Sequence, residues 1–195
     1  MPHLIIIAGP NGAGKTTTAP AVLDNALHIS AFVNADTIAQ GLSAFKPENV
    51  AIEAGLIMLK RIGKLAEEKA NFAFETTLAT RTFAVNLIPE LKKKGYQFHL
   101  IFLWLQSADL AVSRVNERIK MGGHAVPENV IRRRYEAGLR NFFSLYKPLT
   151  DSWQIYDNSN SNDLVLIASE TAEKIITIKN EIIWNKLFEE FSNEK

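Results

Sequence analysis

Residues 9 to 16 read Gly9-Pro10-Asn11-Gly12-Ala13-Gly14-Lys15-Thr16, and this stretch decides the fold. It fits the pattern G-x-x-x-x-G-K-[ST] and lies between an apolar run, Leu4 to Ala8, and a segment with helical periodicity. The glycines allow a tight turn in which the backbone amides point into one concavity, and the following helix adds its positive N-terminus. The stretch predicts a phosphate-binding loop for a nucleoside triphosphate.

The last residues of this loop predict how the nucleotide is held. The Lys15 ammonium group reaches the β- and γ-phosphates, and the Thr16 hydroxyl ligates Mg²⁺. Thr17, the next residue, completes the predicted nucleotide-binding set of the loop. The expected cofactors are therefore ATP or GTP together with Mg²⁺. The loop leaves the acceptor open, because kinases, GTPases, ABC ATPases and helicases share it.

Composition narrows the class of protein. The 195 residues are 47% hydrophobic, which suits one compact domain over residues 1–195. Lysine and arginine (22) nearly balance aspartate and glutamate (21), so we expect no nucleic acid and no membrane surface as a partner. Cysteine is absent, which excludes disulfides and thiolate nucleophiles and fits a cytoplasmic location. No apolar run is long enough to span a membrane.

Short apolar runs alternate with longer segments of helical periodicity, which predicts an α/β fold. Together with the phosphate-binding loop and a lid described below, this predicts the P-loop NTPase/kinase fold. We expect a five-stranded parallel sheet with helices on both faces. The expected strands are Leu4 to Ala8, Ala31 to Asn34, Phe72 to Glu75, Phe98 to Leu105 and Trp153 to Tyr156. The expected helices are Lys15 to Asn25, Glu48 to Glu68, Thr82 to Lys94, Ala108 to Lys120, Glu128 to Tyr146, and a long final one from Leu164 to Phe191.

Polar residues follow the expected strands at their carboxyl ends, where ligands bind in open parallel sheets. Asp36 comes just after the second strand and can serve as general base for an acceptor hydroxyl, or hold Mg²⁺ through water. The alternative is that Asp36 caps the helix Thr37 to Leu42. Glu75 ends the third strand, where it can ligate Mg²⁺ or accept hydrogen bonds from substrate, or simply cap the next helix.

The segment from Arg114 to Arg140 predicts a lid. Two arginine-bearing helices flank the hinge Gly122-Gly123, and Pro127 stops the helical pattern between them. A closing lid brings arginines to the transferred phosphoryl group and excludes water. Successive residues on a helix point about 100° apart, so only one or two of Arg132, Arg133 and Arg134 can face the site. We favour Arg118 and Arg133.

Two further polar residues complete the candidate set. His124, in the lid, is a candidate hydrogen-bond donor to the substrate. Asn158, after the last expected strand, is placed to touch the nucleotide base, and an ordinary turn is the alternative.

Taken together, these motifs resemble the zeta toxin family of P-loop kinases. The resemblance runs from the phosphate-binding loop to Asn158. The shared elements are the Gly9 to Thr16 loop, Asn34-Ala35-Asp36, Phe74-Glu75-Thr76-Thr77-Leu78, the lid from Arg118 to Pro127, and Tyr156-Asp157-Asn158-Ser159.

The resemblance implies a reaction and an acceptor. Well-known members of that family phosphorylate the sugar 3′-hydroxyl of UDP-N-acetylglucosamine with ATP or GTP. The resemblance further implies that Asp36 is the general base, that Glu75 and Thr77 hold the nucleotide sugar, and that lid arginines stabilise the transferred phosphoryl group. Large members carry an arginine soon after Glu-Thr-Thr, whereas this chain has Ala79 there. Either Arg81 substitutes for that arginine, or the substrate contact is lost in this chain. An antitoxin protein is the implied partner.

Two other functions fit the same loop. One is a kinase for another hydroxyl acceptor, including a nucleic-acid end, against which the near-neutral charge argues. The other is a nucleotide-gated ATPase or switch without a small-molecule acceptor. The sequence lacks a Leu-Ser-Gly-Gly-Gln-like signature and an Asn-Lys-x-Asp element, which disfavours this second function.

Overall fold

The computed structural model describes residues 1–24, 29, 31–123, 125–160 and 163–192, and they are built around one sheet. Its strands lie in the order β2-β3-β1-β4-β5-β6-β7. The first five are parallel to one another, and β6 and β7 continue the sheet antiparallel. The strands are β1 (His3–Ala8), β2 (Ala31–Val33), β3 (Phe72–Thr76), β4 (Gln97–Trp104), β5 (Ser152–Asp157), β6 (Val165–Glu170) and β7 (Ile176–Ile178).

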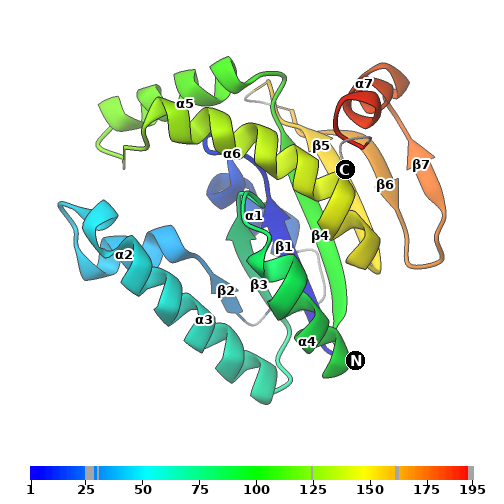
Figure 1. Ribbon diagram of the computed structural model, residues 1–195, viewed down its shortest axis with the longest axis horizontal. Helices are drawn as coiled ribbons and strands as arrows, with labels where there is room; N and C mark the ends of the chain where they lie inside the picture. The colour runs from blue at the N-terminus through cyan, green and yellow to red at the C-terminus, as the bar shows by residue number, and fades with distance from the viewer. Residues whose placement is uncertain (25–28, 30, 124, 161–162, 193–195) are drawn as a thin grey trace.

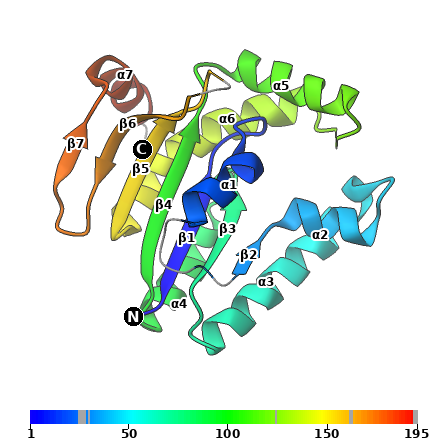
Figure 2. The same cartoon turned by 180° about the vertical axis from the view of Figure 1, so that it is seen from behind.

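Helices cover both faces of this sheet (Figures 1 and 2), as the alternating sequence pattern predicts. Helix α1 lies on one face, and α4 and α6 lie on the other. Helices α2 and α3 form an arm beyond the β2 edge, and α5 stands across from them at the carboxyl ends of the strands (Figure 1). The helices are α1 (Lys15–Asp24), α2 (Ala35–Leu42), α3 (Ala51–Glu67), α4 (Ile88–Lys93), α5 (Ala108–Lys120), α6 (Glu128–Asn141) and α7 (Glu181–Phe191).

Short helical segments extend three of these helices. The 3₁₀ turn η1 (Pro47–Val50) precedes α3, and the π-helical turn η2 (Phe83–Leu87) leads into α4. A second π-helical turn, η3 (Phe142–Tyr146), continues α6 and is followed by the 3₁₀ turn η4 (Lys147–Leu149). Within the described ranges, no helix combines the length and the apolar character needed to cross a bilayer.

The prediction of one long final helix from Leu164 to Phe191 is wrong, and the sheet continues by two strands beyond the five predicted ones. The segment forms β6 and β7, joined by a turn in which Lys174 has a φ of +64°, and only then α7. The five predicted parallel strands are present within one or two residues of their expected bounds. The expected end of the first helix, Asn25, lies outside the described residues.

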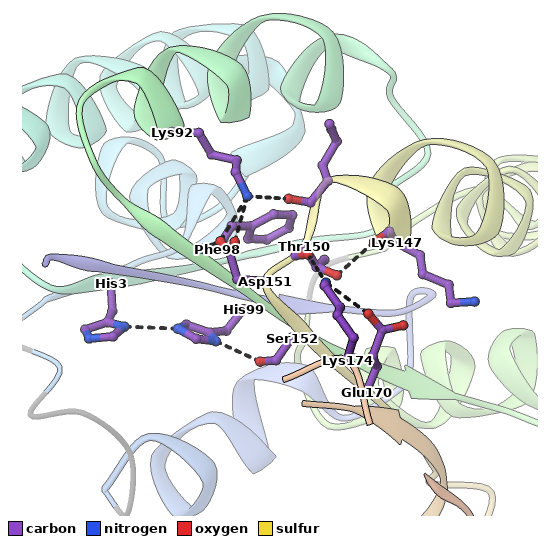
Figure 3. A network of polar contacts seen from close by, with 11 residues as sticks. His3, Lys92, Phe98, His99, Lys147, Thr150, Asp151, Ser152, Glu170 and Lys174 are labelled. Carbon is purple, nitrogen blue, oxygen red and sulfur yellow. Dashed lines mark hydrogen bonds and ion pairs between the residues drawn. The ribbon is translucent and has the colours of Figure 1, made fainter. Parts of the chain in front are cut away.

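The amino ends of three central strands are tied together by polar contacts, shown in Figure 3. His3 Nδ1 of β1 lies 3.0 Å from His99 Nε2 of β4, and His99 Nδ1 lies 2.8 Å from Ser152 Oγ of β5. Nearby, Lys92 Nζ donates to both carboxylate oxygens of Asp151 at 3.0 Å, and the Phe98 amide donates to the same carboxylate. This network holds the amino ends of β1, β4 and β5 together, at the end of the sheet opposite the phosphate-binding loop.

Candidate active site at the carboxyl ends of the strands

The phosphate-binding loop connects β1 to α1 where the sequence predicts it. Gly9 has a φ of +142°, and a Cβ atom built on it would collide with the carbonyl oxygen of Leu103 in β4. Only glycine fits this close approach of two backbones. The loop is therefore seated directly on the end of the sheet, between β1 and β4.

Lys15 is nearly buried, with 9% of its surface exposed, and it lines a cavity next to the loop. Its Nζ donates to the carbonyl oxygens of Gly9 and Pro10 at 3.0 Å. Burial lowers the pKa of Lys15, and the nearby carboxylates of Glu75 and Asp36 act in the opposite direction. The ammonium group thus lies among backbone oxygens and two carboxylates, at the site predicted for the phosphates.

Thr16 and Glu75 meet at the end of β3. The Thr16 hydroxyl donates to Glu75 Oε2 at 2.9 Å, so the two predicted Mg²⁺-related side chains are adjacent. Burial raises the pKa of Glu75, and Lys15 opposes the shift. A hydroxyl, a carboxylate and the Asp36 carboxylate nearby are the hard oxygen donors that Mg²⁺ prefers beside phosphate oxygens. The residues present fit the ion.

Asn34, and not Asp36, caps α2. The Asn34 side-chain oxygen accepts from the backbone amides of Asp36 at 2.7 Å and Thr37 at 3.2 Å. The helix begins at Ala35, so the alternative that Asp36 is its N-cap is wrong. Asp36 instead exposes its side chain at the cavity. Asparagine is a preferred N-cap residue, so the sequence carried this signal two residues before Asp36.

The cavity has a volume of about 400 Å³ and two chemically different sides. Its polar side faces the loop and β3. Its apolar side is formed by α3, where Ile52 is 85%, Leu56 64% and Leu59 41% exposed. The polar lining residues are Asn11, Lys15, Asn34, Asp36, Glu75, Thr76, Thr77 and Arg134.

The three consecutive arginines of α6 have different surroundings. Arg134 lines the cavity, and its Nη1 lies 3.4 Å from Asn11 Oδ1 of the phosphate-binding loop. Burial lowers the pKa of Arg134, and the Asp36 carboxylate opposes that shift. Arg132 is paired with Asp109 at 2.7 Å and with a carboxylate one turn earlier in α6, and the favoured Arg133 is exposed. Arg134 is therefore the α6 arginine that the structure brings into the site.

The lid hinge lies against Arg118 at the end of α5. Gly122 has a φ of +85°, and a Cβ atom on Gly123 would lie 2.5 Å from Arg118 Cγ and 2.9 Å from its carbonyl oxygen. The charge of Arg118 acts on Lys15 and lowers its pKa, after the larger effect of burial. Arg118 therefore packs against the hinge and acts electrostatically on Lys15 of the phosphate-binding loop. The other lid candidate, His124, lies outside the described residues.

Asn158 lies behind the phosphate-binding loop. Its Nδ2 donates to the Ala13 carbonyl oxygen at 2.8 Å. Arg114 in turn donates through Nη1 to the Asn158 carbonyl oxygen at 2.7 Å and through Nη2 to the Ser159 carbonyl oxygen at 2.8 Å. Asn158 and Arg114 therefore join the loop, α5 and the end of β5, a positioning task that the sequence interpretation did not assign.

The two remaining substrate candidates differ in position. Thr77 lines the cavity directly after Thr76, the last residue of β3. Arg81 is exposed and lies outside the cavity lining. The structure thus brings together Lys15, Thr16, Asp36, Glu75 and Thr77, and leaves Arg81 apart from them.

Comparisons with known proteins place this site in a family. The zeta toxin family profile matches residues 1–170. An uncharacterised protein of Haemophilus influenzae is 24% identical over 131 residues, which cover 67% of this chain and 91% of that protein.

Solved structures share the fold. A chain of the PezAT chromosomal toxin–antitoxin system of Streptococcus pneumoniae matches with a TM-score of 0.69 and 19% identity, covering 100% of this chain and 80% of that one. A chain of the AvrRxo1-ORF1:AvrRxo1-ORF2 complex with sulphate ions matches with a TM-score of 0.77 and 17% identity. That match covers 96% of this chain and 63% of the AvrRxo1 chain, so this chain spans less than two thirds of that relative. With its loop, sheet order and family match, the chain belongs to the zeta toxin family.

Proposed function

We propose that this chain transfers the γ-phosphoryl group of ATP or GTP to a hydroxyl of a UDP-N-acetylamino sugar. One observation carries the proposal: Asp36, Lys15, Glu75 and Arg134 line a single cavity beside the phosphate-binding loop. A carboxylate base, two cations and a carboxylate next to the Thr16 hydroxyl are the groups that phosphoryl transfer to an alcohol requires.

The reaction divides among these side chains. Asp36 accepts the proton of the acceptor hydroxyl while the oxygen of that hydroxyl bonds to the γ-phosphorus. The bond between the γ-phosphorus and the oxygen that bridges it to the β-phosphate breaks, and ADP or GDP leaves. Lys15 and Arg134 face the phosphates and compensate their charge, and Arg118 joins them from the lid. Thr16 and Glu75 would hold Mg²⁺, which when bound neutralises phosphate charge.

The acceptor would lie between β3 and α3. Glu75 and Thr77 offer a carboxylate and a hydroxyl to sugar hydroxyl and amide groups. The apolar side chains of Ile52, Leu56 and Leu59 offer a surface against which a ring face can pack. A cavity with one polar and one apolar side suits a sugar attached to a planar base.

The relatives support two parts of the proposal. The AvrRxo1-ORF1:-ORF2 complex has also been solved with ATP, which supports a nucleoside triphosphate as donor. The PezAT proteins are described as a toxin–antitoxin system, which supports an antitoxin protein as a partner of this chain. Mg²⁺ as cofactor and a cytoplasmic location complete the proposal.

The test is an incubation with ATP or GTP, Mg²⁺ and one of several hydroxyl acceptors, followed by mass spectrometry of the products. The acceptors are UDP-N-acetylglucosamine, UDP-glucose, free N-acetylglucosamine and a 5′-hydroxyl oligonucleotide. We expect phosphorylated UDP-N-acetylglucosamine and no product with Lys15→Met. Phosphorylation of another acceptor alone would exclude the nucleotide sugar and keep the kinase. ADP formation without any phosphorylated acceptor would favour an ATPase or switch.

A further inference from the structure

One face of α6 reaches both ends of the active site. Arg134, Gly138 and Asn141 follow one another at spacings of four and three residues, so they share one side of the helix. Arg134 lies at the phosphate end, beside Asn11 of the loop. The other two residues lie one and two turns further along, against the chain that leaves β3.

Gly138 and Asn141 both contact the turn that carries Thr77. A Cβ atom on Gly138 would collide with the Thr77 carbonyl oxygen, so the helix backbone approaches the turn as closely as a glycine permits. Asn141 is 8% exposed, and its Nδ2 donates to the Leu78 carbonyl oxygen at 2.7 Å. A buried amide with a single well-defined acceptor fixes the position of that acceptor.

The turn itself adopts a conformation that needs such support. Leu78 has a φ of +57° and is fully buried, and a branched, bulky residue rarely adopts this left-handed backbone. Its amide donates to Thr76 Oγ1 at 3.2 Å, and the Ala79 amide donates to Thr77 Oγ1 at 3.4 Å. Tyr146 OH, in the continuation of α6, donates to the Thr80 carbonyl oxygen at 2.7 Å.

We propose that Gly138 and Asn141 are positioning residues that set the distance between the acceptor turn and the phosphate-binding loop. The turn presents Thr77 to the acceptor, and the same helix presents Arg134 to the phosphates. Because a helix is rigid over two turns, α6 fixes both groups relative to each other. This inference rests on the proposed function, in which Thr77 holds the acceptor and Arg134 the transferred group.

The kinetic test compares Asn141→Ala and Gly138→Ala with two controls in open surroundings. Ser144→Ala changes an exposed serine of η3, and Gly63→Ala adds a methyl group in α3 where nothing lies within 4 Å. Displacing a bound reactant by about 1 Å can cost about 100-fold in rate, so we expect kcat/KM for the acceptor to fall by about that factor in both test variants. Nucleotide affinity should stay at the wild-type value, and both controls should behave as wild type.

A second measurement follows the turn directly. Amide hydrogen exchange at Leu78 and Ala79 should become faster in Asn141→Ala and, to a smaller extent, in Tyr146→Phe, a mild change that removes only the hydroxyl group. This arm reports on the turn even if no acceptor is phosphorylated, so failure of the proposed function and failure of this inference are distinguishable.

Three results would overturn the inference. The first is wild-type exchange at both amides in Asn141→Ala. The second is faster exchange with unchanged acceptor kinetics, because catalysis would then not require the contacts of Gly138 and Asn141 with the turn. The third is a parallel loss of nucleotide affinity, because it would mean that the substitutions disturb the whole site.

Discussion

Lys15, Glu75 and Arg134 are charged side chains held where burial disfavours their charge. Burial lowers the pKa of Lys15 and of Arg134 and raises that of Glu75, and in each case a neighbour of opposite sign acts against the shift. Groups fixed in this way do not have to reorganise when charge develops on a phosphoryl group. Charged groups whose pKa values are shifted by burial are common at functional sites.

Arg134 gives a prediction at the residue scale. Because it lines the cavity beside Asn11, Arg134→Ala should lower the rate of phosphoryl transfer by about 100- to 1,000-fold, the usual effect of removing one charge-stabilising donor. The matched control is Arg133→Ala, which removes an exposed arginine from the neighbouring position. The measurement is kcat for both variants at saturating nucleotide.

The opposite ranking, with Arg133→Ala slow and Arg134→Ala near wild type, would return the role to the residue that the sequence favoured. Periodicity alone could not choose between them, because the rotation of α6 about its axis depends on how it packs on the sheet. Buried residues such as Ile131, Tyr135 and Leu139 set that rotation, and they become identifiable as core only in the fold.

Helix α2 gives a prediction at the scale of the element. The Asn34 side chain accepts from two amides at the start of the helix. Asn34→Ala should therefore lower the free energy of unfolding by about 1 kcal/mol. Denaturant titration measures this change, and Asn34→Ser, which keeps a capping oxygen, should recover most of it. Equal stability of Asn34→Ala and wild type would show that solvent or another group satisfies these amides.

Elements with a local signal were predictable, and the carboxyl-terminal strands were not. Buried strands such as β1 stand out as apolar, β-branched runs beside a glycine-rich loop. In the segment from 164 to 191, isoleucines recur at helical spacing and hide the strands. Strand pairing decides that this segment forms strands and not a helix: β6 pairs with the free edge of β5, and β7 pairs with the free edge of β6. The β-branched run Ile175-Ile176-Thr177-Ile178 was the overlooked signal.

The stability of the whole molecule should depend on pH through the polar network of Figure 3. Burial lowers the pKa of His3 and that of His99, and His3 further lowers the pKa of His99. Around them lie the Ser152 hydroxyl, the Asp151 carboxylate, which raises the pKa of His99, and Lys92, which lowers it. The fold therefore favours neutral imidazoles at the amino ends of β1 and β4.

The sign of the effect follows from proton binding. Because both histidines have pKa values in the folded protein below the ordinary histidine value of 6.5, the unfolded chain binds more protons than the folded one as the pH falls through that value. The stability contributed by the histidines is complete above that pH and is lost below it. The melting temperature of the wild type should fall between about pH 8 and about pH 5, and that of His99→Asn should fall less. An equal or steeper fall in the variant would contradict this role.

The proposed role of Asp36 as general base decides whether the whole cavity acts as a kinase site. The direct measurement is the single-turnover rate of phosphoryl transfer to the acceptor with wild type and Asp36→Asn, together with the nucleotide dissociation constant of each. Since general base catalysis contributes about 100- to 10,000-fold, we predict a loss within that range with unchanged nucleotide affinity. A wild-type rate in Asp36→Asn, or a loss of nucleotide affinity that accounts for the slower rate, would contradict it.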